Sequence, residues 1–184
     1  MTSATTGTAG ARDSTPAATR LALLATLAIT AAAVAEYVRR RPDAAIEPGF
    51  AGAFLWLFSA LFLVRVAGQL VVRVRHPSWL PPTEEWNLTP YRLLLPVQLT
   101  ILGVMAWVDS SFSGAAGAPV DARPGLGEGV VIFAYVYAGS MLARYAVRMT
   151  RRPGERWFGG TIPIVFHLVL AAYLYVFGSF HASY

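Results

Sequence analysis

The sequence predicts an all-α integral membrane protein, a bundle of about five transmembrane helices that follows a disordered N-terminal tail. Of the 184 residues, 55% are apolar and only 14% are charged, whereas about 25% of the residues in an ordinary soluble domain are charged. The apolar residues gather in five stretches, each close to the roughly 20 residues that a helix needs to cross a bilayer. These stretches lack the alternating pattern of β-barrel strands.

The chain divides into a tail, residues 1–19, and a transmembrane domain, residues 20–184. The tail consists mainly of Thr, Ala, Ser and Gly, which cannot bury enough apolar surface to offset the entropy lost on ordering. The transmembrane helices are predicted at about residues 21–38, 50–74, 91–108, 129–149 and 161–180.

The first apolar stretch has two interpretations. Ala33-Val34-Ala35 resembles a signal-peptidase site, and cleavage there would leave four helices. The arginines at 39–41 follow directly and would resist export, so an uncleaved anchor is favoured.

Two connections between helices differ in character. The loop from His76 to Tyr91 is rich in proline and tryptophan, which predicts either a stiff connector on the membrane interface or a lid over a pocket. The loop from Asp109 to Glu128 is rich in Gly, Ala and Pro, which predicts a flexible external connection.

The arginines predict the orientation of the chain. If all five helices span the membrane, nine arginines lie on the side of the N-terminus and four on the other side. Cytoplasmic loops carry the excess of positive charge, so the N-terminus is predicted to be cytoplasmic in a bacterial-type inner or plasma membrane. The triplet at 39–41 is the one conflicting signal.

Several kinds of chemistry are excluded by composition. The chain has no cysteine and no lysine, which excludes disulfides, thiolate catalysis and Schiff-base chemistry. It also lacks the Asp-x-x-Asp motif of magnesium-dependent prenyltransferases and the serine elbow of hydrolases.

Six polar residues inside the predicted helices are candidate site residues, because a central arginine costs about 2.5–3.5 kcal/mol on insertion scales. All six fall in the predicted cytoplasmic half: Arg65, Gln69, Gln98, Arg144, Arg148 and His167. Arg65 and Gln69 are four residues apart and therefore share one helix face. The sequence thus predicts convergence in depth, but it does not fix how each helix is rotated.

A layer rich in arginine and poor in carboxylates favours an anionic ligand, held by bidentate guanidinium groups. In a membrane this would be a lipid phosphate, a prenyl diphosphate or a fatty carboxylate. Arg65, Arg144 and Arg148 would bind its head, and Gln69 and Gln98 would donate further hydrogen bonds. The alternative is that Arg144 and Arg148 only extend to lipid headgroups.

His167 is the candidate catalytic residue, because it is the one predicted intramembrane group that exchanges protons near neutral pH. Glu84 and Glu85 would add a second acid–base group if the proline-rich loop folded back. No metal or cofactor is predicted. Heme ligation through His167 is a minor alternative, since two bis-histidine hemes need four histidines and the chain has three.

The backbone N–H groups at the start of the fifth helix, after Gly159 and Gly160, are a further candidate for anion binding. The expected partners are membrane lipids and a lipid-like anionic substrate, and no nucleic acid is expected. The competing hypothesis is a non-catalytic accessory or assembly subunit of a larger membrane complex, because small residues on the fifth helix suit close packing against another subunit.

Overall fold

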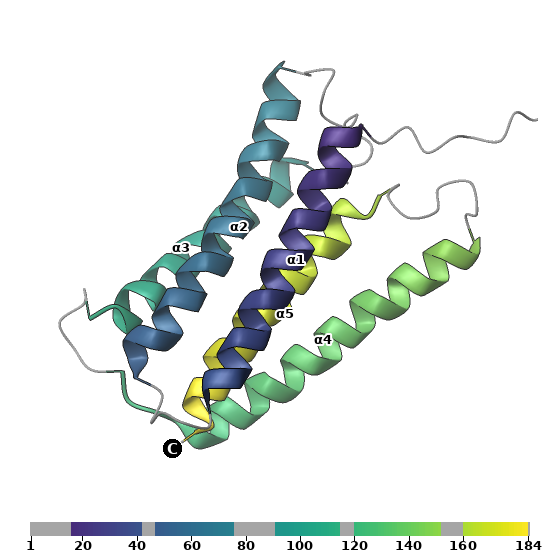
Figure 1. The fold of residues 1–184 in the computed structure, drawn as a ribbon. Coiled ribbons are helices and arrows are strands. Elements are labelled where there is room, and N and C mark those ends of the chain that lie inside the picture. Colours follow the sequence, from purple (N-terminus) through teal and green to yellow (C-terminus); the bar gives the residue numbers. More distant parts are fainter. Residues whose placement is uncertain (1–15, 42–46, 76–90, 115–119, 152–159, 184) are drawn as a thin grey trace, which may run out of the picture.

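The computed structural model describes residues 16–41, 47–75, 91–114, 120–151 and 160–183, and these ranges are all-helical. The five helices are α1 (Ala17–Arg40), α2 (Pro48–Arg75), α3 (Tyr91–Phe112), α4 (Pro124–Arg151) and α5 (Ile162–His181). Each is long enough and apolar enough to cross a membrane. The predicted number and order of helices are confirmed for this part of the chain (Figure 1).

Three predictions concern residues outside the described ranges. They are the disorder of the tail up to residue 15, the lid formed by the proline-rich loop with Glu84 and Glu85, and the contribution of Gly159 to an anion site.

Four of the five helices are longer than the apolar stretches that predict them, and α5 has the predicted length. α1 begins at Ala17, so residues 17–19 of the predicted tail are helical. α3 continues past Val108 to Phe112, and α4 begins at Pro124 rather than at Gly129. Proline suits a first helical position, because its φ angle is already helical and the N–H it lacks would have no partner there. The predicted external loop over Asp109–Glu128 is therefore shorter, because both of its ends are helical.

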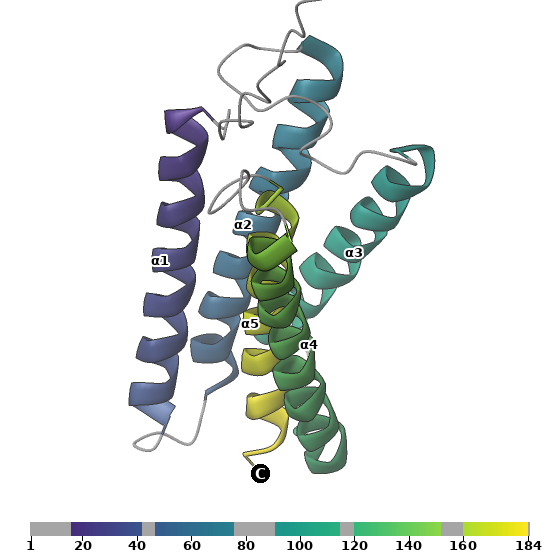
Figure 2. The same ribbon diagram turned by 90° about the vertical axis from the view of Figure 1, so that its right-hand side faces the viewer.

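α5 is the central helix of the bundle. In its apolar span 67% of the residues are buried, against 6% in that of α4. α5 packs against α1, α2 and α4, whereas α3 packs against α2. Among the described residues α1 and α4 do not pack against each other, and they lie on different sides of α5 (Figures 1 and 2).

One end of the bundle is named here the arginine-rich end. α1 and α5 begin there and α2 and α4 end there (Figure 1). Its arginines within the described helices are Arg20, Arg73, Arg75, Arg92, Arg148 and Arg151. The termini of the described chain lie at opposite ends, as an odd number of antiparallel helices requires.

The outer surface of the bundle differs from that of a water-soluble bundle, and its apolar core contains several buried polar side chains. Large apolar residues face outward, including Trp107 at 73% exposure and Val136 at 65%. Arg65, Gln69 and Asp109 are buried instead. Contiguous exposed apolar surface of this extent suits lipid rather than water.

α1 is an integrated part of the bundle. The Tyr37 side chain is fully buried and accepts a hydrogen bond of 3.1 Å from the Ser179 hydroxyl of α5. Its ring also packs against Phe50 and Phe54 of α2, with centroids 5.8 and 5.5 Å away. Tyr37 lies after the Ala33-Val34-Ala35 site, so these contacts would persist after cleavage, and the retention of the first helix stays a prediction.

Candidate functional site

Arg65 lies within α2 with 5% of its surface exposed. Its Nη1 donates a hydrogen bond of 3.3 Å to the Pro163 carbonyl of α5, and its Cζ lies 5.6 Å from the centroid of the Phe166 ring. The buried Nε has no hydrogen-bond partner. In the described part of the chain the ion pairs are those of Glu36 with Arg39 and Arg40, so no carboxylate there neutralises Arg65.

His167 and Arg65 are hydrogen-bonded to the same acceptor, the Pro163 carbonyl. Its Nδ1 is hydrogen-bonded to the Pro163 carbonyl, one turn earlier in α5. Because a carbonyl can only accept, Nδ1 carries the proton, and in the neutral ring Nε2 is then the basic nitrogen. The half-buried imidazole packs edge-on against Tyr137 of α4, with ring centroids 5.9 Å apart.

Two buried glutamines have unpartnered amide atoms. Gln69, one turn after Arg65 on α2, is fully buried, and neither its amide nitrogen nor its oxygen has a hydrogen-bond partner. Gln98 of α3 is 5% exposed, and its Oε1 is also without a partner. An unpartnered buried amide costs about 1–3 kcal/mol, so these two positions are unusual for a core that serves packing alone.

The two arginines of α4 occupy different surroundings. Arg144 is exposed and lies two helical turns after Tyr137, whose ring packs against His167. Arg148 is half-buried, and its guanidinium occupies the space where a side chain on Gly160 would lie. Gly160 has a φ of +59°, a conformation that glycine adopts without steric cost. Arg148 therefore covers the start of α5 rather than joining Arg65.

The structure thus brings together some of the predicted site residues. Arg65 and His167 share an acceptor, and the α4 residue that contacts His167 is Tyr137, two helical turns before Arg144. Gln69 and Gln98 are buried in the neighbouring α2 and α3 layer. The assignment of these residues to a ligand stays a prediction.

A buried carboxylate was missed by the sequence reasoning. Asp109 of α3, expected in a loop, is fully buried. It accepts hydrogen bonds from the Ser59 hydroxyl of α2 at 2.6 Å and from the Tyr173 hydroxyl of α5 at 3.0 Å. The signal that could have found it is its place directly after an apolar stretch, where one more helical turn keeps it inside the bundle.

A groove runs between α1 and α4 over α5. It consists of two adjoining cavities of about 540 and 270 Å³, both of which are lined by Leu27 and Leu168. The larger cavity is lined by several alanines: Ala31, Ala35, Ala134, Ala138, Ala171 and Ala172. Tyr145 and Thr161 line it toward the arginine-rich end. The groove is therefore apolar, with small residues on all three of its helices.

Within the ranges given above, no group of three or more His, Asp or Glu residues is placed to hold a metal ion. The prediction of no cofactor, and the minor alternative of heme at His167, remain predictions. Comparisons of this chain with protein-family models, with curated proteins and with solved structures give no match.

Proposed function

We propose that this chain is an integral membrane protein that binds an amphipathic, lipid-like anion at the arginine-rich end of its bundle. The proposal rests mainly on one observation: Arg65 and His167 are both hydrogen-bonded to the Pro163 carbonyl. An arginine buried among apolar helices without a carboxylate is costly. An anionic headgroup would offset that cost through charge-assisted hydrogen bonds.

The residues take distinct roles in this proposal. Arg65 and Arg144 hold the anionic head on either side of His167, and the amides of Gln69 and Gln98 donate further hydrogen bonds. Arg148 has a positioning role at the start of α5, because it packs on Gly160. If the ligand is converted, the basic Nε2 of His167 is the group that moves a proton.

Access from the bilayer is consistent with the packing of the helices. α2 packs against α5 and so does α4, but among the described residues α2 and α4 do not pack against each other. His167 is half-buried and Arg144 is exposed on this side. A lipid could therefore approach laterally, with its chain against the exposed apolar surface of α4. The distribution of arginines supports an orientation with the N-terminus in the cytoplasm.

The test is the lipid that copurifies with the protein from mild detergent. Lipid extraction and mass spectrometry are expected to show an anionic lipid with the wild type and its loss, by about tenfold or more, in Arg65→Gln. Arg75→Gln is the matched control, because this exposed arginine lies on the same helix at its end. An unchanged lipid profile in Arg65→Gln would contradict the proposal.

A second function, that of an accessory or assembly subunit, is favoured by the groove between α1 and α4. Small residues let transmembrane helices approach closely, and this groove is lined by alanines from α1, α4 and α5. A transmembrane helix of another subunit is the occupant that this lining suits. Ala138→Leu would then abolish copurification of a stoichiometric partner, whereas Ala143→Leu, at an exposed position of the same helix, would retain it.

A further inference from the structure

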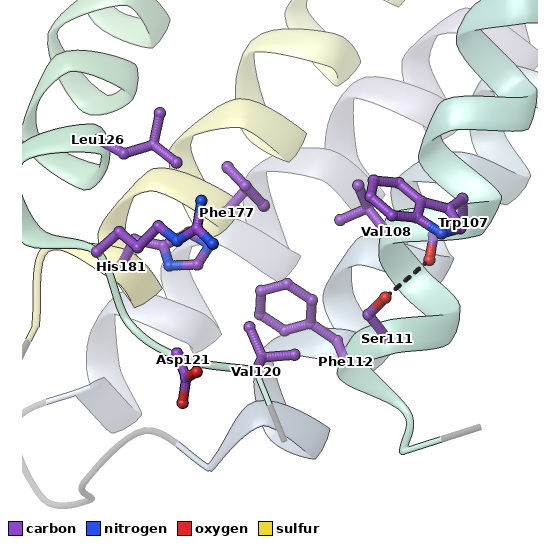
Figure 3. Close-up of a pocket in the computed structure, with 10 residues that line it drawn as sticks. Trp107, Val108, Ser111, Phe112, Val120, Asp121, Leu126, Phe177 and His181 are labelled. Atoms are coloured by element: carbon purple, nitrogen blue, oxygen red, sulfur yellow. Dashed lines mark hydrogen bonds between the residues drawn. The ribbon is translucent and has the colours of Figure 1, made fainter. Parts of the chain in front are cut away.

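A separate cavity of about 360 Å³ lies at the other end of the bundle, between the ends of α3 and α5 and the start of α4. Its two sides differ in character (Figure 3). One side carries His181 and Asp121, and the other carries Trp107 and Val108 of α3. Arg123 also lines the cavity. The cavity is therefore amphipathic, and it is far along the helices from Arg65.

His181 forms part of the wall of this cavity. The side chain is 5% exposed, and its Nδ1 is buried without a hydrogen-bond partner in the described chain. Three phenylalanines fix the ring edge-on: Phe177, Phe180 and Phe112, at centroid distances of 4.6, 5.3 and 6.0 Å. These contacts hold the imidazole in one orientation at the wall of the cavity.

The charge next to His181 is positive. Arg123 lines the same cavity as His181, and within the described ranges Arg123 forms no ion pair. The carboxylate of Asp121 points away from the imidazole (Figure 3). An acceptor with negative charge is therefore favoured beside His181, while the aromatic rings of Phe112 and Phe177 favour an apolar body.

We propose that this cavity binds a small apolar monocarboxylate. Its carboxylate accepts hydrogen bonds from the Arg123 guanidinium and from the Nε2–H group of His181, since Nδ1 is buried away from the cavity. Its apolar part lies against Phe112 and Phe177 and extends toward Trp107. The volume matches the lower end of the range for small-molecule pockets, about 300–1,000 Å³, so a long-chain lipid is too large. This site is independent of the anion site at the arginine-rich end.

Benzoate and hexanoate are suitable probes, with benzamide as the neutral analogue of benzoate. Calorimetric titration of the full-length protein in lipid nanodiscs is expected to show binding of a carboxylate and at least about tenfold weaker binding of benzamide. Arg123→Gln is expected to weaken carboxylate binding by a similar factor. Asp121→Asn is expected to leave the affinity unchanged or to raise it, because it removes a nearby negative charge.

Two further variants complete the test. His181→Phe keeps an aromatic ring against Phe177 but removes the ring nitrogens, so carboxylate binding should fall while the thermal midpoint changes little. Glu128→Gln, an exposed carboxylate also near the start of α4, is the control and should bind as the wild type does. Equal affinity for benzamide and benzoate, undiminished binding in Arg123→Gln, or no binding of either carboxylate would overturn the proposal.

Discussion

Arg65 of α2 and His167 of α5 donate hydrogen bonds to the same acceptor, the carbonyl oxygen of Pro163. Pro163 lies in the first turn of α5, so one carbonyl links two helices and orients both a guanidinium and an imidazole. The shared acceptor also fixes the proton of the neutral imidazole on Nδ1, which leaves Nε2 as its base.

Variants of Arg65 and His167 test ligand binding and ligand conversion separately. His167→Phe retains a ring against Tyr137 and leaves Arg65 in place, so the copurifying anionic lipid should be retained at the wild-type level. Arg65→Gln should lose it. If the protein converts its ligand, conversion should stop in His167→Phe while binding persists. Mass spectrometry of extracted lipids measures both properties, and loss of the lipid in His167→Phe would show that the imidazole serves binding as well.

Gln69 is expected to reduce the stability of the ligand-free protein. Its buried amide has no hydrogen-bond partner, so Gln69→Met should raise the free energy of unfolding by about 1–3 kcal/mol. Leu70→Met, at a half-exposed neighbouring position, should change it by less than about 0.5 kcal/mol. Chemical unfolding in detergent micelles measures both variants. A Gln69→Met protein that is less stable than the wild type would indicate that the amide is satisfied in the folded state.

The hydrogen bonds to Asp109 should contribute measurably to stability. Ser59→Ala and Tyr173→Phe each remove one donor to a fully buried carboxylate, and each should cost about 1–2 kcal/mol. Ser111→Ala is the control. It removes a hydroxyl that donates to the carbonyl of Trp107, one turn earlier in the same helix, and the free energy of unfolding should hardly change. Thermal unfolding followed by circular dichroism checks the three variants, and equal midpoints for all of them would rule out this contribution.

Gly127 of α4 and Gly178 of α5 mark the closest approach of these two helices. A Cβ on Gly127 would collide with backbone atoms of His181 and Ala182, and one on Gly178 would lie 2.9 Å from the Val131 nitrogen. Gly127→Ala should therefore lower stability by about 1–3 kcal/mol.

The matched control is Gly129→Ala, where nothing lies within 4 Å of the added Cβ. Alanine is the better helix former, so this variant should gain about 0.5–1 kcal/mol. Thermal midpoints that move in the same direction for both variants would contradict the close crossing of α4 and α5.

The topology can be tested with single cysteines, because the chain has none of its own. Thr5→Cys and Ser183→Cys place one thiol near each terminus. Five membrane crossings put the two termini on opposite sides, so an impermeant thiol reagent added outside intact cells should label Ser183→Cys alone if the N-terminus is cytoplasmic. Labelling of both variants from the same side would exclude five crossings.

The sequence by itself determined the number and order of the helices. Each helix is specified locally, by a run of apolar residues close to the thickness of a bilayer, and this signal does not depend on any distant residue. The same reasoning placed Arg65, Gln98 and His167 at a similar depth, because depth follows from the rise per residue along a helix.

Only the tertiary structure decided which faces of the helices meet. Rotation about a helix axis is set by contacts between residues far apart in the chain, and no local pattern records it. For this reason Arg65 and His167 share an acceptor while Arg144 is exposed, although the sequence predicts all three in the same half of the membrane. Asp109 is the clearest case, because its burial depends on hydroxyl groups 50 residues before it and 64 residues after it.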